Sequence, residues 1–316
     1  TNRYNYAPVN HFLRPIEQWS VGAFAEYELN EHFTPYFETM FASNTSRAQI
    51  AESGTFFAEA YILDLDDFPA PFQAALIDLY GTDYDEYGVY VGKRNVEGGP
   101  RSDNTSHDSF RIVTGLKGDI NDTWSYDVSY LYANTRSTST YVNDFFAPNI
   151  TKNIDPDTAD ILYDVFTYQG VTSEQAAALT GVGILNGNSS TEVINGFVTG
   201  DLFALPTASD PIKVVVGYEW REETFERLSD TVFEEGQLLG QGGPTPSLIG
   251  SYNVTEFFGE ANVPLLDGLA LDLAYRYSDY STVGGQDTYR AGLDWQPIDL
   301  VRFRVVDQLG ARIQVP

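Results

Sequence analysis

Charged side chains on the strands predicted for the second half of the chain are the residues most able to bind a polar solute. Arg221, Glu256, Arg276 and Arg290 each lie in a run where apolar and polar residues alternate. Successive side chains of a strand point to opposite faces, so these charges are expected on the polar face. They could line the route of a polar solute. They could instead pair with one another, because charges that face an interior must be satisfied. We favour this second interpretation.

Carboxylate clusters and histidines are the next candidates, because both can bind metal ions. Asp64–Asp67 and Asp83–Glu86 offer the oxygen ligands that Ca²⁺ takes, but neither has the register of an EF-hand loop. Acidic loops of this kind are usually solvated. His11, His32 and His107 are scattered, none at metal-ligand spacing from another. We therefore expect neither a metal site nor a cofactor.

Motifs of enzyme active sites are missing from the sequence. It contains no cysteine, no Gly-x-Ser-x-Gly elbow, no phosphate-binding glycine loop and no zinc motif. Many pairs of carboxylates occur, but no spacing singles one out, so a glycosidase assignment would be arbitrary. We expect no enzymatic activity. Tyr84 and Tyr87, in an acidic connection, could stack on a ring of a solute or pack that connection against itself, and both interpretations stay open.

Composition excludes several classes of partner. The 316 residues include 18 Lys and Arg against 45 Asp and Glu, a formal charge of −27. Nucleic acid needs a basic footprint, so it is not expected as a partner. The mean hydropathy is −0.25, and no run of about 18 apolar residues could form a transmembrane helix. Strands that alternate can nevertheless cross a membrane, because averaging hides their apolar face.

Ten runs of the chain alternate in this way and predict strands. Short and long connections follow one another between them, and the long ones cover 44–108, 134–190 and 222–251. Within these, helices are expected at Pro71–Tyr80, Asp155–Tyr168 and Ser173–Leu179. The predicted strands are Trp19–Leu29, His32–Ser43, Ser109–Ile120, Trp124–Tyr132, Glu192–Phe203, Ile212–Arg221, Tyr252–Val263, Leu269–Ser278, Thr288–Trp295 and Val301–Arg304.

The tryptophans give an independent indication of a membrane. Trp19 and Trp220 lie at the long-connection ends of their strands, and Trp124 and Trp295 at the short-turn ends. All four belong to the apolar face, as two girdles of membrane-interface aromatics require. The predicted fold is an all-β, antiparallel transmembrane β-barrel meander of about ten strands, with short periplasmic turns and long extracellular loops. We expect it in the outer membrane of a Gram-negative bacterium, in contact with lipid.

Several blocks of sequence also resemble the TonB-dependent outer-membrane receptors. Their order and spacing carry the resemblance across most of residues 4–304. The family implies a barrel of about 22 strands, closed by a plug, that imports scarce solutes with energy from the inner-membrane TonB-ExbB-ExbD system. Ten strands are roughly half of such a barrel. The blocks are Ala23–Leu29 (AFAEYEL), Ser53–Phe57 (SGTFF), Trp124–Tyr132 (WSYDVSYLY), Val216–Glu222 (VGYEWRE), Val254–Leu266 (VTEFFGEANVPLL), Tyr275–Tyr280 (YRYSDY) and Gly292–Pro297 (GLDWQP).

Two departures from the family pattern shape the expected domain organisation. No plug and no TonB-contacting segment is recognised in the sequence. Residues 305–316 do not resemble the expected barrel strand. We therefore expect a partial barrel over 1–304 and an atypical tail over 305–316, from a truncation or frameshift. The implied function is receptor-mediated uptake of siderophore-bound iron, a cofactor or an oligosaccharide. A passive porin remains the alternative, and a soluble all-β glycan-binding module or enzyme a more distant one.

Overall fold

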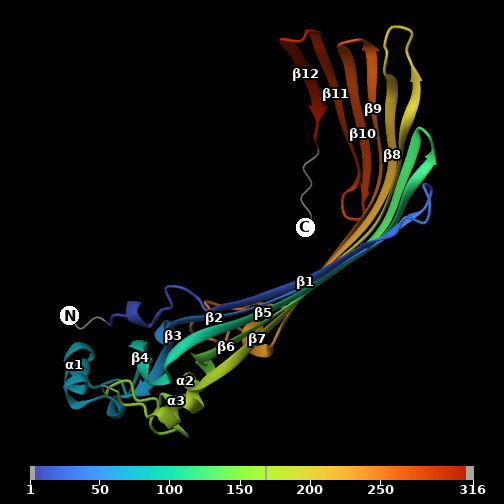
Figure 1. Cartoon of the computed structure of the whole chain (residues 1–316). Coiled ribbons are helices and arrows are strands. Elements are labelled where there is room, and N and C mark those ends of the chain that lie inside the picture. The colour runs from blue at the N-terminus through green and yellow to red at the C-terminus, as the bar shows by residue number, and fades with distance from the viewer. Residues whose placement is uncertain (1–3, 168, 311–316) are drawn as a thin grey trace.

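A single antiparallel sheet dominates the structure, a computed structural model that describes residues 4–167 and 169–310 (Figure 1). Its ten strands follow the order β1-β2-β5-β6-β7-β8-β9-β10-β11-β12, and β3 and β4 form a separate two-stranded sheet. The expected ten-stranded meander is therefore confirmed. The main strands are β1 (Ile16–Glu26), β2 (Thr34–Glu52), β5 (Pro100–Asn121), β6 (Trp124–Phe145), β7 (Thr180–Ala204), β8 (Pro211–Ser229), β9 (Leu248–Leu266), β10 (Leu269–Tyr280), β11 (Gly284–Ile298) and β12 (Val301–Leu309).

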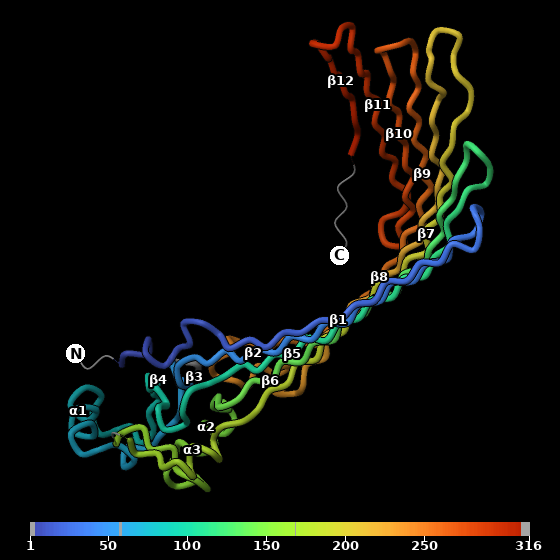
Figure 2. The backbone as a smooth tube through the Cα atoms, viewed as in Figure 1, coloured from blue at the N-terminus to red at the C-terminus, as the bar shows by residue number. Residues whose placement is uncertain are grey.

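The sheet is strongly twisted and does not close on itself. Figure 2 shows its strands sweeping from the end that carries the long connections to the end that carries the short turns. β1 and β12 form the two edges. β12 runs through the expected boundary after Arg304 and stays paired with β11 as far as Leu309. Residues 311–316 of the expected tail lie outside the described part of the chain, and the division at 304 stays a prediction.

The register separates an apolar from a polar face, because directly paired residues point to the same side. Tyr130, Ile194 and Trp220 are partners across β6, β7 and β8. The residues next to these in sequence point to the opposite face. Their direct partners form a mostly polar row that crosses most of the sheet. That row consists of Glu26, Tyr36, Gly115, Ser129, Asn195, Glu219, Glu256, Ser278 and Gln286.

The middle strands are longer than the sequence predicts. β6 places five aromatic or aliphatic side chains of Trp124–Tyr132 on the apolar face, and then continues on that face with Asn134, Arg136 and Thr138. A membrane-spanning strand needs only about 9–11 residues, so the second half of β6 extends beyond any apolar band. Neighbouring strands there are joined by hydroxyl pairs, such as Ser190–Thr224 at 2.6 Å. Much of the three predicted long connections is therefore strand, which corrects the prediction.

Two of the long connections fold into a unit with its own core, which we call the loop cap (residues 53–99 and 146–179). It contains the hairpin of β3 (Gly54–Asp64) and β4 (Glu86–Arg94), and the helices α1 (Ala70–Tyr80), α2 (Ala147–Asn153) and α3 (Ser173–Leu179). Figure 1 places it at one end of the sheet. The hairpin was not predicted. The buried apolar core of the loop cap also includes Phe145, the last residue of β6, and consists of Tyr61, Leu63, Phe68, Val91, Phe145, Ile150, Ile154, Tyr163, Val171, Ala176 and Leu179.

Two of the three predicted helices are confirmed, as α1 and α3. Thr172 caps α3 in a capping box, in which its hydroxyl accepts from the amide of Gln175 at 3.2 Å. The third prediction, Asp155–Tyr168, is wrong, with residue 168 outside the described part. Asp155 accepts instead from the amide of Asp157 and the hydroxyl of Thr158, both at 2.8 Å, and such local bonds compete with a helix. A further short helix, α4 (Thr231–Glu234), lies in the third long connection.

Candidate functional site

Most charges on the polar face are paired with one another. Glu256, only 5% exposed, accepts from the guanidinium of Arg276 at 3.0 Å and from the hydroxyl of Ser278 at 2.6 Å. Similar cross-strand contacts engage other charged side chains of this face. They include Lys117–Glu26 and Arg111–Glu38, both at 2.9 Å, and Asn195–Glu219 at 3.1 Å.

Arg221 and Arg290 lie on the strands to either side of that pair, Arg221 diagonal to Glu256 and Arg290 diagonal to Arg276. The Nε of Arg221 is 3.4 Å from Glu223 on the same strand, yet it makes no hydrogen bond within the described residues. Arg290, on β11, is directly paired with Ala274, and the described residues provide it with neither an ion pair nor a hydrogen bond.

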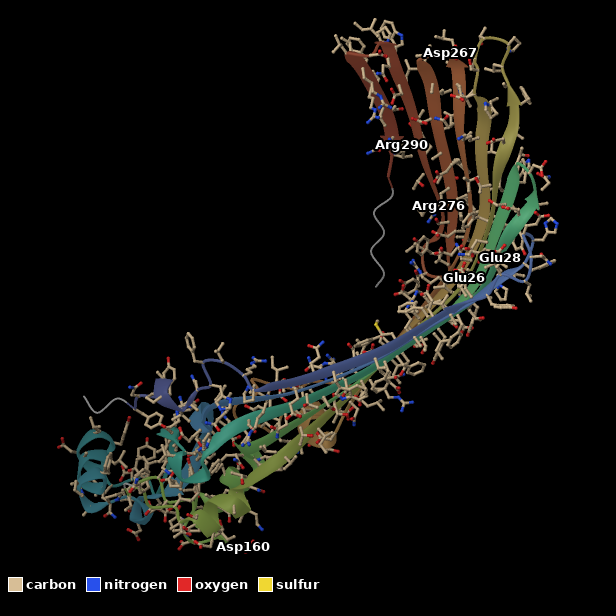
Figure 3. All side chains as sticks on the ribbon, viewed as in Figure 1. Glu26, Glu28, Asp160, Asp267, Arg276 and Arg290 are labelled. Atoms are coloured by element: carbon tan, nitrogen blue, oxygen red, sulfur yellow. The ribbon has the colours of Figure 1, made fainter. Side chains whose placement is uncertain are left out.

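Figure 3 labels Arg276 and Arg290 at different heights of the sheet. Arg276 and Arg290 nevertheless line one shared hollow of about 420 Å³, and Glu256 adjoins it through its ion pair with Arg276. Three of the four predicted residues are thus neighbours, whereas Arg221 does not line this hollow.

A hollow of about 520 Å³ opens on the polar face beside Arg290. It lies over β9–β12, towards the short-turn end of the sheet. Asp294 accepts there from Arg302 at 2.7 Å and from Arg304 at 2.8 Å, so those cations are engaged. Arg290 is exposed and also lines this hollow. Among the cations that line it in the described part of the chain, Arg290 is the one without an ion pair, so it is free to contact a solute.

Tyr84 and Tyr87 lie in the loop cap, far along the sheet from these arginines. Tyr87 is half-buried and meets the buried ring of Phe68 edge-on, with 6.0 Å between centroids. Its hydroxyl donates to the carbonyl of Tyr84 at 3.3 Å. Tyr87 thus packs the connection against itself, whereas the ring of Tyr84 is exposed.

The four tryptophans all belong to the apolar face. Trp124 lies over Gly200, where a Cβ would come within 2.2 Å of the indole, so this close approach requires glycine. Trp295 stacks on its direct partner Phe303 at 5.5 Å. Trp19 packs on Phe41 at 5.0 Å, and Trp220 is paired with Ile194. Their contact with a membrane interface stays a prediction.

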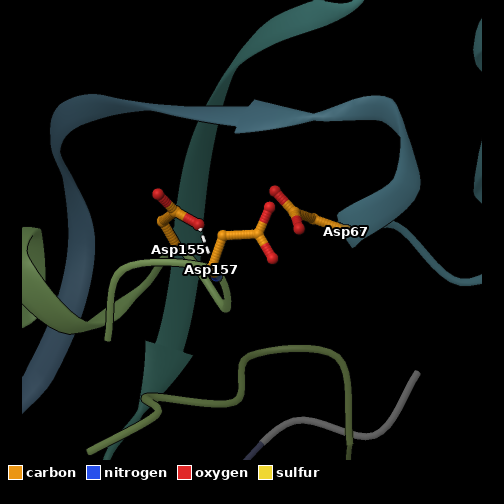
Figure 4. A group of neighbouring side chains, drawn as sticks. All are labelled: Asp67, Asp155 and Asp157. Carbon is orange, nitrogen blue, oxygen red and sulfur yellow. Dashed lines mark hydrogen bonds between the residues drawn. The ribbon is translucent and has the colours of Figure 1, made fainter. Parts of the chain in front are cut away.

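Three carboxylates gather in the loop cap, as Figure 4 shows. The candidate ligand oxygens of Asp67, Asp155 and Asp157 lie within 4.8 Å of one another. Burial, together with the neighbouring carboxylates, raises the pKa of Asp67 above its usual range. Only Asp67 belongs to the clusters singled out in the sequence. Asp155 is half-buried and Asp157 exposed, and solvation alone can account for such a group.

A buried polar network at the base of the loop cap was not foreseen. Asp144, at 0% exposure, accepts from the hydroxyl of Ser53 and from the amides of Phe145 at 3.0 Å and Gly240 at 2.9 Å. Arg101 donates to the carbonyl of Gly240 at 3.3 Å. Burial raises the pKa of Asp144, although these donors oppose the shift. The network ties the end of β6 to connections far apart in sequence, and nothing in the sequence distinguishes Asp144 from other acids.

No helix within the described residues has the length and apolar character needed to cross a membrane. Comparison with protein families is decisive. The family "TonB dependent receptor-like, beta-barrel" matches residues 60–306. The chain belongs to this family. A ten-stranded antiparallel meander with an apolar and a polar face fits a wall segment of a TonB-dependent receptor barrel.

Solved structures similar to the chain include bacterial siderophore receptors. Two are mutants of the ferric enterobactin receptor PfeA from Pseudomonas aeruginosa. One is 15% identical over 91% of this chain, with a TM-score of 0.47, and the other 14% identical over 92%, with a TM-score of 0.49. The siderophore receptor PirA from Acinetobacter baumannii is 12% identical over 90%, with a TM-score of 0.46. The chain spans 32% of the length of each of these three. No curated protein sequence matches it.

Proposed function

We propose that the chain forms part of the wall of an outer-membrane receptor that takes up a scarce solute with energy from the TonB system. The family match over residues 60–306 carries this proposal. The function proposed is transport and not catalysis. The partners proposed for the whole receptor are outer-membrane lipid, the TonB-ExbB-ExbD system and a small solute.

The two faces of the sheet support a position in the membrane. The apolar band on β6 begins at Trp124 and ends near Tyr132, and the band on β8 ends at Trp220. This height matches the roughly 9–11 residues that a tilted strand uses to cross the hydrocarbon core. The band then faces lipid, the polar face lines the barrel interior, and the loop cap lies outside the cell.

Pairing and exposure reduce the number of candidate residues that could contact a solute, in the barrel interior or in the loop cap. Glu256 and Arg276 satisfy each other, so their first role is to hold β9 and β10 together. Arg290 faces the hollow without a partner in the described chain, and Tyr84 is exposed in the loop cap. We propose these two as solute contacts, with Arg221 as a weaker third because Glu223 lies beside it.

Deleting the coding region in the host bacterium tests the proposal. Uptake of labelled ferric siderophores, cobalamin and oligosaccharides would be measured in the deletion strain, in a strain without TonB and in the double mutant. We expect the deletion to abolish uptake of one solute, and the loss of TonB to abolish the same uptake without further effect in the double mutant. Uptake that needs this chain but persists without TonB would indicate a passive channel and contradict the proposal.

A further inference from the structure

The helix α1 is mostly apolar, with Gln73 and Asp78 as its exceptions, yet it is not buried. Asp78 is its one charged residue, and none of its residues is buried in the folded chain. Phe72 is 57% exposed, Leu79 72% and Tyr80 59%. A helix with so few polar residues normally lies inside a protein, and a contiguous exposed apolar patch marks an interaction surface. Part of the loop cap therefore has the character of an interface.

Aromatic rings continue this surface across the loop cap in close steps. Phe72 contacts Phe166 at 6.1 Å between centroids, Phe166 contacts Phe68 at 5.5 Å, Phe68 contacts Tyr87 at 6.0 Å, and Tyr87 contacts Tyr80 at 6.2 Å. We call these five rings the aromatic ridge. Phe68 at its centre is only 5% exposed and belongs to the core of the cap. The exposed rings are thus held in place by a buried one, and the surface is formed before any partner arrives.

The charge around the aromatic ridge has one sign. The two segments of the loop cap contain fourteen acidic residues and three basic ones. Each basic side chain is already engaged: Lys93 contacts Glu97 at 3.0 Å, Arg94 donates to the carbonyl of Glu52 at 2.7 Å, and Lys152 pairs with Asp160. Acidic residues also interrupt the ridge itself, with Asp83, Asp85 and Glu86 between Tyr80 and Tyr87 in sequence. A partner must therefore supply positive charge.

We infer that the aromatic ridge docks an extended, basic peptide segment with apolar side chains. Cations are attracted to the faces of aromatic rings, and the surrounding carboxylates complement lysine and arginine. Alternate side chains of an extended peptide are about 6.6 Å apart, close to the 5.5–6.2 Å steps between the rings. Anionic lipid and nucleic acid carry the charge that this surface repels. The inference concerns a partner outside the barrel and does not depend on transport.

Binding to the purified full chain in detergent micelles tests the inference. The probe is a short fluorescent peptide of alternating lysine and leucine, with a glutamate and leucine peptide as its counterpart, measured by anisotropy over a salt series. We expect the basic peptide alone to bind. F72S/L79S should weaken binding roughly tenfold, because the apolar contact is lost. D83N/D85N/E86Q should weaken it roughly threefold and flatten its salt dependence.

Matched variants elsewhere separate docking on the ridge from general attraction to an acidic chain. L248S/I249S removes two exposed apolar side chains at the start of β9, and it should leave binding unchanged. Equal loss in both apolar variants, or no loss in F72S/L79S, would overturn the inference. So would binding of the chain to phosphatidylglycerol vesicles that F72S/L79S abolishes, because the occupant would then be a membrane. Phe72 and Leu79 are both exposed, so F72S/L79S should fold, which circular dichroism would check.

Discussion

Arg276 on β10 donates to Glu256 on β9 at 3.0 Å, and the carboxylate is almost fully buried whereas the guanidinium is nearly half exposed. Arg276 also lies over the ring of Phe258, with its guanidinium carbon 5.0 Å from the centroid. Because Glu256 is buried and Arg276 is not, the ion pair matters more for the carboxylate, which has little access to water, than for the guanidinium. Glu256 and Arg276, which were candidates for contact with a solute, therefore help to join β9 to β10.

Removing Arg276 alone should lower the free energy of unfolding more than removing both partners of this pair. R276A leaves a buried carboxylate with Ser278 as its remaining donor, and we expect it to lower the free energy of unfolding by about 1–3 kcal/mol. The double variant E256M/R276L should recover most of that loss, since both charges leave together. Urea unfolding of the full chain in detergent would measure the cycle. Additive losses in the double variant would show that the two side chains do not interact.

Arg290 should behave differently from Arg276 although both are arginines on the polar face. It contacts no acid within the described chain, so R290A should change the free energy of unfolding by less than about 0.5 kcal/mol. If Arg290 meets the solute, R290A should still reduce uptake in the host, with R290K recovering part of it. A destabilisation as large as that of R276A would mean that Arg290 has a structural role.

The burial of Asp144 predicts a pH dependence of the loop cap. Its pKa in the folded chain is raised above the ordinary value of 3.8, so the folded chain binds the proton more tightly than the unfolded one. The free energy of unfolding should therefore rise as the pH falls from the folded pKa towards 3.8, and this gain is lost as the pH rises again. D144N cannot titrate. The stability of the unmodified chain relative to D144N should grow on acidification, and parallel pH profiles would contradict the assignment.

The cap of α3 gives a local prediction. Thr172 accepts from the amide of Gln175 at 3.2 Å, and the side chain of Gln175 accepts from the amide of Thr172 at 2.7 Å. T172A should destabilise the first turn by about 1 kcal/mol. Hydrogen exchange should then accelerate at the amides of α3 by roughly fivefold, one kcal/mol expressed as a rate, while β6 and β7 keep their protection. T172S, which retains the hydroxyl, should exchange like the unmodified chain.

The sequence predicted the strands well where one face is apolar and the other polar. β10 was expected at Leu269–Ser278 and is observed at Leu269–Tyr280. On β6 the prediction stopped at Tyr132, because Asn134 and Thr138 follow on the same face. Both faces of the strand are polar there, so alternation no longer marks it. The β3–β4 hairpin was missed for a related reason: its pairing shifts between Phe56 and Ala60, which breaks the period of two.

The candidate residues were harder to predict than the strands. Their face followed from alternation, but pairing depends on which strands are neighbours and in what register. Glu256 reaches Arg276 because Phe258 is the direct partner of Arg276, and no spacing along the chain encodes this. Asp144 illustrates the limit more sharply, since its partners Ser53 and Gly240 are 91 and 96 residues away in sequence.

The proposed position in the membrane requires that one face of the sheet meets lipid and the other lines the barrel interior. Val214, Val215 and Val216 on β8 give a matched test, because they alternate between the faces and the chain has no cysteine of its own. The substitutions V214C, V215C and V216C would each be labelled with a water-soluble maleimide in outer-membrane preparations of the host. We predict that V215C reacts at least about tenfold faster than the other two, which lipid shields. Equal reaction at all three positions, or faster reaction at V214C and V216C, would contradict a membrane-spanning sheet.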